Sequence, residues 1–363
     1  MHPVHDRVLA YIDDPAGGSF EALAVEVFAH QFEAIEPYRQ YCLARGVTPD
    51  TVRQWTAIPP VPIRAFKRAE LCCGRPQRTF LSTGTSEGPL SRSRHLMPDL
   101  RLYERSAVTG MRAYLFPDLP RARLLSLVPP VDLEPHSSLA QMVAWAFEYF
   151  AAPGSVFAVT ASGLDVDRLI AVLRDSERDG QPCCILATTG ALIRLLDFAR
   201  QRSLTFRLPH GSRLMDTGGD KGAPRRLSRP GLLHACWNTF GIPGYFCVNE
   251  YGMAELSSQF YDNVIANRCA GRFARRCKVG PPWTRSLVVD PASLGPVGQG
   301  QKGLLCHFDL ANAGTAMAVL TEDVGRAVED GFELLGRASG AETRGCSLSS
   351  AEWETSEREQ KSI

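Results

Sequence analysis

Short apolar runs alternate with longer helical patterns between residues 123 and 251, and this alternation restricts the possible folds more than any other feature of the sequence. Strands are predicted at 123–128, 155–159, 183–187, 213–217 and 245–248, and helices at 137–150, 164–174 and 191–200. Apolar strands separated by helices of ten or more residues form right-handed βαβ units. We therefore expect an α/β protein whose large domain has mostly parallel sheets flanked by helices.

Two glycine-containing turns follow strands of this predicted sheet. Gly218 and Gly219 come directly after the strand at 213–217, and the strand at 245–248 runs into Glu250-Tyr251-Gly252. Ligands of parallel sheets bind at the carboxyl ends of the strands. The two turns therefore lie where a binding site is expected.

The segments on either side of the alternating region have different patterns. Residues 1–75 are predicted to be helical and irregular, with apolar residues at helical spacing over 20–44 and an extended proline-rich segment at 58–63. A helix is predicted at 98–114, with Pro98 at its first position. From about residue 280 shorter strands at 286–289, 303–308 and 316–320 indicate a small antiparallel or barrel-like β subdomain.

Composition excludes several classes of protein. Forty basic and 39 acidic residues give a formal charge of +1, which does not indicate a dominant surface for nucleic acid or anionic membranes. The chain has no apolar run of about 18 residues, and its N-terminus lacks the apolar core of a signal peptide. The eleven cysteines form no C-x-x-C motif and are expected as free thiols in a reducing compartment, with Cys183 and Cys184 in the core. We expect a cytoplasmic protein without a membrane span.

A loop rich in glycine and hydroxyl residues lies at 82–94. Gly84 and Gly88 allow the backbone to turn and to present its N–H groups to an anion. Hydroxyl groups and two arginines add donors and positive charge suited to phosphate: Ser82, Thr83, Thr85, Ser86, Arg92 and Arg94. Taken alone, the same composition also fits an ordinary surface loop.

Three further motifs follow in order along the chain: 248–256 (VNEYGMAEL), 321–326 (TEDVGR) and 335–340 (LGRASG). With the loop at 82–94 they resemble the motifs of adenylate-forming enzymes, which join a carboxylate to AMP. The chain is most similar to the acyl-protein synthetases of the bacterial luminescence fatty-acid reductase, the LuxE type, and next to the phenylacetate–CoA ligases. The resemblance extends from about Ile58 to Leu348. It implies a helical segment at 1–75, an adenylation domain at 76–335 and a short C-terminal segment at 336–363.

The resemblance also implies roles for individual residues. The loop would hold the β- and γ-phosphates of ATP, with Arg92 in place of the lysine that is usual in the family. Glu255 would bind Mg²⁺, and Asp323 would accept hydrogen bonds from the ribose hydroxyls. Tyr251 would stack on adenine. The remaining nucleotide-binding candidates are Gly218, Gly219, Asn249, Glu250, Gly252 and Arg337.

Each of these roles has a purely structural alternative. Tyr251 could pack at the edge of a turn, and Glu255 could be an acid in the first turn of a helix. Asp323 could be a solvated acid at a strand end. The order of the four motifs favours the functional interpretation over these alternatives.

The C-terminal segment departs from the pattern of most adenylate-forming enzymes. Only residues 336–363 follow the hinge motif, where those enzymes carry a mobile lid with a catalytic lysine. The same segment contains Cys346, two residues after Arg344. A neighbouring arginine lowers the pKa of a thiol, and a thiolate is the nucleophile that an acyl-adenylate requires. Cys346 is therefore the candidate acyl acceptor.

These residues predict an enzyme that uses ATP and Mg²⁺ to activate a carboxylic acid, expected to be a fatty acid, as an acyl-adenylate. The acyl group would pass to a cysteine of the protein itself or of a partner, for which an acyl-accepting reductase or a carrier protein is the candidate. An acid–CoA ligase of the phenylacetate–CoA type and a catalytically inactive nucleotide-binding scaffold stay open as alternatives. The sequence does not identify the acid.

Overall fold

The computed structural model describes residues 2–82, 92–219 and 225–338. Contacts between residues divide the chain into two compact units. The first unit comprises residues 1–109, 253–259 and the chain from residue 277 onward, and the second comprises 110–252 and 260–276. The divisions predicted near residues 75 and 335 stay predictions.

The second unit is built on a sheet with the strand order β11-β10-β9-β8-β4-β5. These strands are β4 (Arg123–Ser126), β5 (Val156–Phe157), β8 (Cys183–Thr188), β9 (Arg213–Thr217), β10 (Cys247–Tyr251) and β11 (Phe260–Asp262). All neighbours from β10 to β5 pair in parallel, and β11 pairs antiparallel with β10. The predicted parallel sheet is confirmed.

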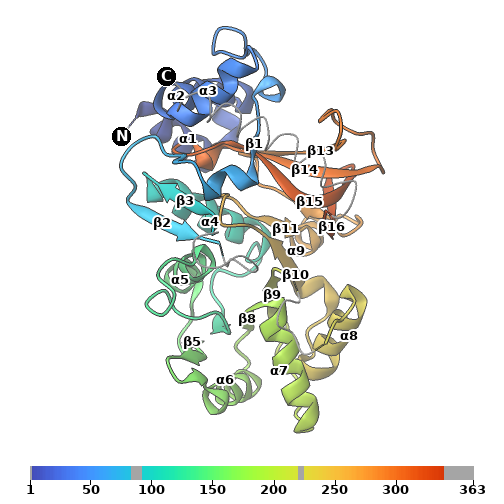
Figure 1. Cartoon of the computed structure of the whole chain (residues 1–363). Coiled ribbons are helices and arrows are strands. Elements are labelled where there is room, and N and C mark those ends of the chain that lie inside the picture. The colour runs from blue at the N-terminus through green and yellow to red at the C-terminus, as the bar shows by residue number, and fades with distance from the viewer. Residues whose placement is uncertain (1, 83–91, 220–224, 339–363) are drawn as a thin grey trace. The chain divides into compact units, whose positions relative to one another are not determined.

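Helices follow the strands of this sheet as the alternating pattern predicts (Figure 1). They are α5 (Ser138–Phe150), α6 (Val166–Asp179), α7 (Thr189–Gln201), α8 (Arg229–Phe240) and α9 (Val264–Cys269). Ser137 caps α5, because its hydroxyl accepts a hydrogen bond from the Ala140 N–H. The side chains of Cys183 and Cys184 in β8 are fully buried, as predicted for a strand covered on both faces.

Two boundaries in this unit differ from the prediction. Helix α6 begins after Asp165, whose carboxylate caps it, and ends at Gly180, which has φ +71°. These two caps place the helix later and make it longer than the predicted 164–174. Strand β10 begins at Cys247, because Gly244–Phe246 form a 3₁₀ turn after Pro243. The strand then continues through Tyr251, so Glu250 and Tyr251 are strand residues rather than turn residues.

The N-terminal part of the first unit is helical, with α1 (Pro3–Asp13), α2 (Phe20–Ala34) and α3 (Glu36–Ala44). The single apolar pattern predicted over 20–44 is divided into α2 and α3 at Ile35, which has an extended backbone. Pro37 lies in the first turn of α3 and cannot continue the preceding helix. The Tyr38 hydroxyl donates to the Pro59 carbonyl oxygen at 2.9 Å, which fixes the proline segment against α3.

Most of the remaining first unit is a sheet with the strand order β13-β14-β15-β16-β12. Its strands are β12 (Lys278–Val279), β13 (Thr284–Val289), β14 (Lys302–Asp309), β15 (Ala318–Val328) and β16 (Gly331–Arg337). Strands β13 to β16 and β12 pair antiparallel, one of the two arrangements expected for this part of the chain. The proline segment adds β1 (Val61–Pro62) in parallel to β15, with Val61 opposite Val319. A short 3₁₀ helix, η6 (Leu310–Asn312), follows β14.

The segment at 82–94 joins β2 (Arg78–Leu81) to β3 (Arg94–Met97), which pair antiparallel. Helix α4 (Leu100–Tyr114) follows, so Pro98 precedes the helix instead of occupying its first position. Asp99 lies between them and accepts a hydrogen bond from the Arg101 N–H at 3.2 Å. Among the helices of the described ranges, none combines the length and apolar character needed to cross a bilayer.

Candidate functional site

The base of the glycine-rich loop is held closed by two serines. The Ser82 N–H donates to the Ser93 carbonyl oxygen at 3.1 Å, and the Ser93 N–H donates to the Ser82 hydroxyl oxygen at 2.9 Å. Arg92 is exposed next to this pair. Thr83, Gly84, Thr85, Ser86 and Gly88 lie outside the described residues. The described part of the loop therefore supplies its closed base and one exposed cation.

Glu255 contacts this base. Its carboxylate accepts a hydrogen bond from the Ser93 hydroxyl, and the residue is only 4% exposed. Burial raises the pKa of the Glu255 carboxyl, the negative charge of Asp323 raises it further, and the hydrogen bond from Ser93 and the positive charge of Arg337 oppose the increase. Ser93, Glu255, Asp323 and Arg337, which belong to four separate motifs, are thus close enough to affect one charge.

Asp323 and Arg337 are paired by the sheet. They occupy opposite positions in the register of β15 and β16, and Arg337 Nε lies 3.2 Å from Asp323 Oδ1. Arg337 also approaches Glu322 Oε2 at 3.5 Å, and its side chain is 65% exposed. Because a carboxylate has several lone pairs, Asp323 can accept further hydrogen bonds while it is paired with Arg337.

Glu255 lies in the irregular segment between β10 and β11 rather than in the first turn of a helix. The alternative role of Glu255 as an acid in the first turn of a helix is therefore wrong. No three His, Cys, Asp or Glu side chains within 2–82, 92–219 and 225–338 are grouped so as to hold a metal ion. Mg²⁺ commonly binds one or two carboxylates together with substrate phosphates and water. A single buried carboxylate whose charge is poorly compensated fits that mode of binding.

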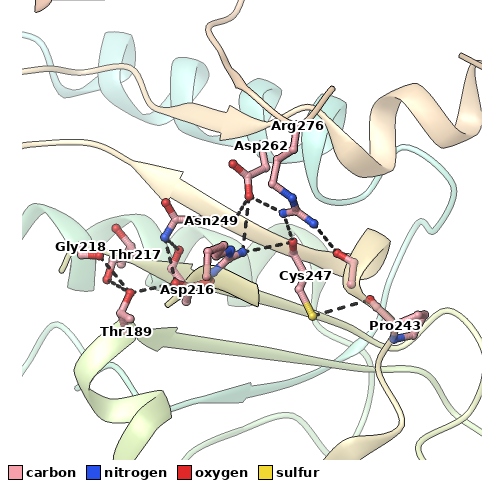
Figure 2. Close-up of polar contacts among 11 residues, drawn as sticks. Thr189, Asp216, Thr217, Gly218, Pro243, Cys247, Asn249, Asp262 and Arg276 are labelled. Atoms are coloured by element: carbon pink, nitrogen blue, oxygen red, sulfur yellow. Dashed lines mark hydrogen bonds and ion pairs between the residues drawn. The ribbon is translucent and has the colours of Figure 1, made fainter. Parts of the chain in front are cut away.

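The second unit contains a polar network that joins the carboxyl end of β9 to the middle of β10 (Figure 2). Asp216 Oδ2 accepts from the Thr189 hydroxyl at 2.8 Å and from Asn249 Nδ2 at 2.9 Å. The Thr189 hydroxyl also lies 2.9 Å from the Gly218 carbonyl oxygen. Gly218 has φ +72°, a conformation that favours glycine, and both Gly218 and Gly219 are exposed. The network thus fixes the glycine turn and the Asn249 side chain to the same carboxylate.

Two arginines balance two buried aspartates in the remainder of this network. Arg229 NH1 donates to Asp216 Oδ1 at 2.6 Å, and Arg276 NH1 donates to Asp262 Oδ2 at 2.5 Å. Asp262 Oδ2 also accepts from the Asn249 N–H at 3.0 Å. Asp216 and Asp262 are almost fully buried. Asn249 is therefore held through both its backbone and its side chain.

The residues after Asn249 are mostly buried. Glu250 accepts a hydrogen bond from the Thr217 hydroxyl and lies inside the unit. The Tyr251 ring lies 6.0 Å from the Phe260 ring and is 7% exposed, and Gly252 is exposed. The packing role of Tyr251 is thus visible, and its stacking on adenine stays a prediction.

Sequence reasoning missed the residues that support these candidates. Asp216 lies within the strand predicted at 213–217 but is not among the candidate residues, and neither is Thr189. A carboxylate inside a strand that is predicted to be buried is a signal that could have identified Asp216, because a buried carboxylate requires partners. No local sequence pattern predicts the contacts among Asp262, Arg229 and Arg276.

Comparison with known proteins gives a match to the family model of the LuxE acyl-protein synthetases over residues 5–354. The long-chain-fatty-acid–luciferin-component ligase of Aliivibrio fischeri is 22% identical over 364 residues, covering 94% of this chain and 92% of that protein. The ligase of the same name from Vibrio harveyi is 22% identical over 204 residues, covering 54% of this chain and about half, 51%, of that protein.

Among solved structures, an open conformation of 2-hydroxyisobutyryl-CoA ligase in complex with 2-HIB-AMP and CoA matches with a TM-score of 0.62 and 15% identity. The match covers 86% of this chain and 73% of that one, and it confirms the predicted fold class. Because the family model spans nearly the whole sequence, the chain belongs to the LuxE family of acyl-protein synthetases, the family that its four motifs resemble.

Proposed function

We propose that this protein joins a long-chain fatty acid to AMP at the expense of ATP and then transfers the acyl group to a cysteine thiol. Membership in the acyl-protein synthetase family makes the chain an ATP-dependent ligase that activates an acid. A long-chain fatty acid is the proposed substrate because both curated relatives are named for one. The observation that supports this function best is the grouping of Ser93, Asp323 and Arg337 around the buried carboxylate of Glu255.

Adenylation brings two anions together. A carboxylate oxygen forms a bond to the α-phosphorus of ATP, and the bond from that phosphorus to the oxygen of pyrophosphate breaks. Such a step requires positive charge and N–H donors where negative charge develops. Arg92, exposed at the closed base of the loop, is the proposed cation for the phosphates.

Glu255 is the proposed ligand for Mg²⁺, which when bound neutralises phosphate charge during the reaction. Asp323 is the proposed acceptor for the ribose hydroxyls, with Arg337 Nε 3.2 Å from its Oδ1. Gly218, Gly219, Asn249, Glu250, Tyr251 and Gly252 keep their predicted role in nucleotide binding.

Transfer of the acyl group requires an accessible thiolate, which attacks the carbonyl carbon and releases AMP. Most of the ten described cysteines are poorly suited, because seven of them are buried. Burial raises the pKa of Cys183 to about 12 and that of Cys72 to about 11, and Cys269 is exposed but also has a raised pKa. Cys346, which lies outside the described residues, is therefore the proposed acceptor, and a partner reductase or carrier protein is the proposed next recipient.

The test of adenylation is exchange of labelled pyrophosphate into ATP over a panel of carboxylic acids of increasing chain length. We expect exchange that depends on the acid and on Mg²⁺ and that is highest with long-chain fatty acids. No exchange with any acid would refute the proposal and favour an inactive nucleotide-binding scaffold.

The acceptor is tested separately with labelled fatty acid and ATP. Cys346→Ser should abolish a hydroxylamine-sensitive label on the protein and leave pyrophosphate exchange intact, since adenylation precedes transfer. Cys269→Ser is the matched control and should keep the label. A label that persists in Cys346→Ser would exclude Cys346, and acyl-CoA as the product with added CoA would favour the acid–CoA ligase.

A further inference from the structure

Residues 254–258, which include Glu255, form no helix or strand. A segment without regular structure must be positioned by other contacts if its side chains are to have defined places. In the first unit those contacts come from the turn that joins β14 to β15 and from β3. Nearly all of the side chains involved are completely buried, so the contacts are made away from solvent.

Asp309, at the end of β14, holds the second half of the segment. Its Oδ2 accepts from the backbone N–H groups of Ser257 at 3.1 Å and Ser258 at 2.8 Å. Its Oδ1 accepts from the Ser258 hydroxyl at 2.6 Å and from the Ala311 N–H at 3.0 Å. Burial raises the pKa of Asp309 to about 6, and these four donors favour its ionised form.

Asn312, at the end of η6, binds the backbone of Glu255 directly. Its Nδ2 donates to the Glu255 carbonyl oxygen at 2.9 Å, and its Oδ1 accepts from the Ser257 N–H at 2.9 Å and the Ser257 hydroxyl at 2.7 Å. Nδ2 also donates to the Ala316 carbonyl oxygen at 2.9 Å. One side chain thereby ties the backbone on both sides of Leu256 to the turn.

His95 in β3 holds the residue before Glu255. Its Nδ1 lies 2.6 Å from the Ala254 carbonyl oxygen, and its Nε2 lies 3.0 Å from the Thr315 hydroxyl. A carbonyl oxygen only accepts, so Nδ1 carries the proton and Nε2 accepts from Thr315. Burial lowers the pKa of His95 to about 4, which keeps this tautomer neutral. Two residues earlier in the chain, the Ser93 hydroxyl contacts the Glu255 carboxylate itself.

We propose that Asn312 and Asp309 are positioning residues for adenylation, which hold residues 254–258 so that the Glu255 carboxylate stays directed toward the base of the glycine-rich loop. This inference rests on the proposed role of Glu255. The network is buried and each of its groups has a partner, the condition under which a polar network gives a segment one defined conformation. A displacement of about 1 Å at a reacting group costs up to about 100-fold in rate.

Gln31 provides a matched control. From α2 it donates to the Asn312 and Ala313 carbonyl oxygens at 2.9 and 3.2 Å and accepts from the Met317 N–H at 3.1 Å. It therefore stabilises the same turn without contacting residues 254–258 through any of these bonds. If the turn had only a structural role, Gln31→Ala and Asn312→Ala would lower the rate of pyrophosphate exchange equally whenever they lower the melting temperature equally.

The experiment is a double-mutant cycle between Asn312 and Glu255, measured by acid-dependent pyrophosphate exchange. Asn312→Ala should lower kcat about 10- to 100-fold, with a smaller change in KM for ATP. Asp309→Asn should also lower kcat, because it places an amide NH₂ group where the carboxylate accepts from backbone N–H groups. The double variant Glu255→Gln/Asn312→Ala should be no slower than Glu255→Gln alone, because the second residue acts through the first. Gln31→Ala should keep kcat within about threefold of the wild type at temperatures where it is folded.

Additive losses in the cycle, or a loss in Gln31→Ala equal to that in Asn312→Ala, would overturn the proposal. A second readout does not depend on turnover. Mn²⁺ bound in the presence of ATP, measured by electron paramagnetic resonance, should be weakened by Asn312→Ala and by Glu255→Gln but not by Gln31→Ala. Wild-type protein without exchange would refute the proposed function, and equal Mn²⁺ binding by all variants would then refute the positioning role on its own.

Discussion

Asp216 is the carboxylate on which the polar network of the second unit depends, so Asp216→Ala should weaken that part of the sheet. The change removes three acceptor contacts, to Thr189, Asn249 and Arg229, at 2.8, 2.9 and 2.6 Å. Removing one partner of a buried ion pair costs about 3–5 kcal/mol. Because the Arg229 side chain is 27% exposed and keeps Asp262 at 3.4 Å, we expect the lower end, about 3 kcal/mol.

Hydrogen exchange of the β9 and β10 amides measures this loss without requiring the two units to unfold together. A loss of about 3 kcal/mol corresponds to exchange that is roughly 100-fold faster. Asp197→Ala is the control, because Asp197 pairs with Arg225 and Arg200, whose side chains are 44% and 71% exposed. These exposed ion pairs of Asp197 should contribute less than about 1 kcal/mol to stability. Exchange in Asp216→Ala that is no faster than in Asp197→Ala would refute the reasoning.

Three further predictions concern the first unit. Asp323→Ala should weaken ATP binding by roughly 1.5–3 kcal/mol in calorimetry, since it removes the proposed ribose acceptor; an unchanged Kd would exclude that role. Glu255→Gln should lower kcat for exchange more than it raises KM for ATP, because charge at the metal matters most in the transition state. His95, whose pKa falls from 6.5 to about 4, stays neutral in the folded protein while the unfolded chain takes up a proton, so the contribution of this residue to stability should rise by about 3 kcal/mol as the pH rises from 4 to 6.5. The raised pKa of Asp309 acts in the opposite direction. His95→Asn, which keeps a donor near the Ala254 carbonyl oxygen, should therefore gain less stability, or lose more, than the wild type over this pH range in urea titrations; an unaltered slope would contradict the assignment.

Much of the fold was predictable because its cause is local. Strands β8 and β9 are short segments bounded by turns and helices, and their length and their alternation with helices identify them as buried parallel strands. Strand β15 was predicted at 316–320 but runs to Val328, since Glu322, Asp323 and Arg326 interrupt the apolar pattern although the backbone continues in the sheet. Helix α6 was misplaced where its capping residues were overlooked.

Residues of the candidate site were predictable only where they belong to a short sequence motif. Glu255 and Asp323 were identified from short patterns, and the structure brings Glu255 near Ser93, Asp323 and Arg337. Asp309 and Asn312 lie more than fifty residues from the segment that they hold. No periodicity or local propensity links positions so far apart, because their meeting depends on how β14 and the following turn pack in the folded unit.

The central claim is that the carboxylate attacks the α-phosphorus of ATP. Fatty acid labelled with ¹⁸O in its carboxylate tests this most directly, by mass spectrometry of the nucleotide released after transfer to the thiol. In the transfer step the bond between the carbonyl carbon and the oxygen that bridges to phosphorus breaks. AMP should therefore carry one ¹⁸O atom in its phosphate, and pyrophosphate should carry none. Release of ADP with ¹⁸O in inorganic phosphate would show attack at the γ-phosphorus and would contradict the account.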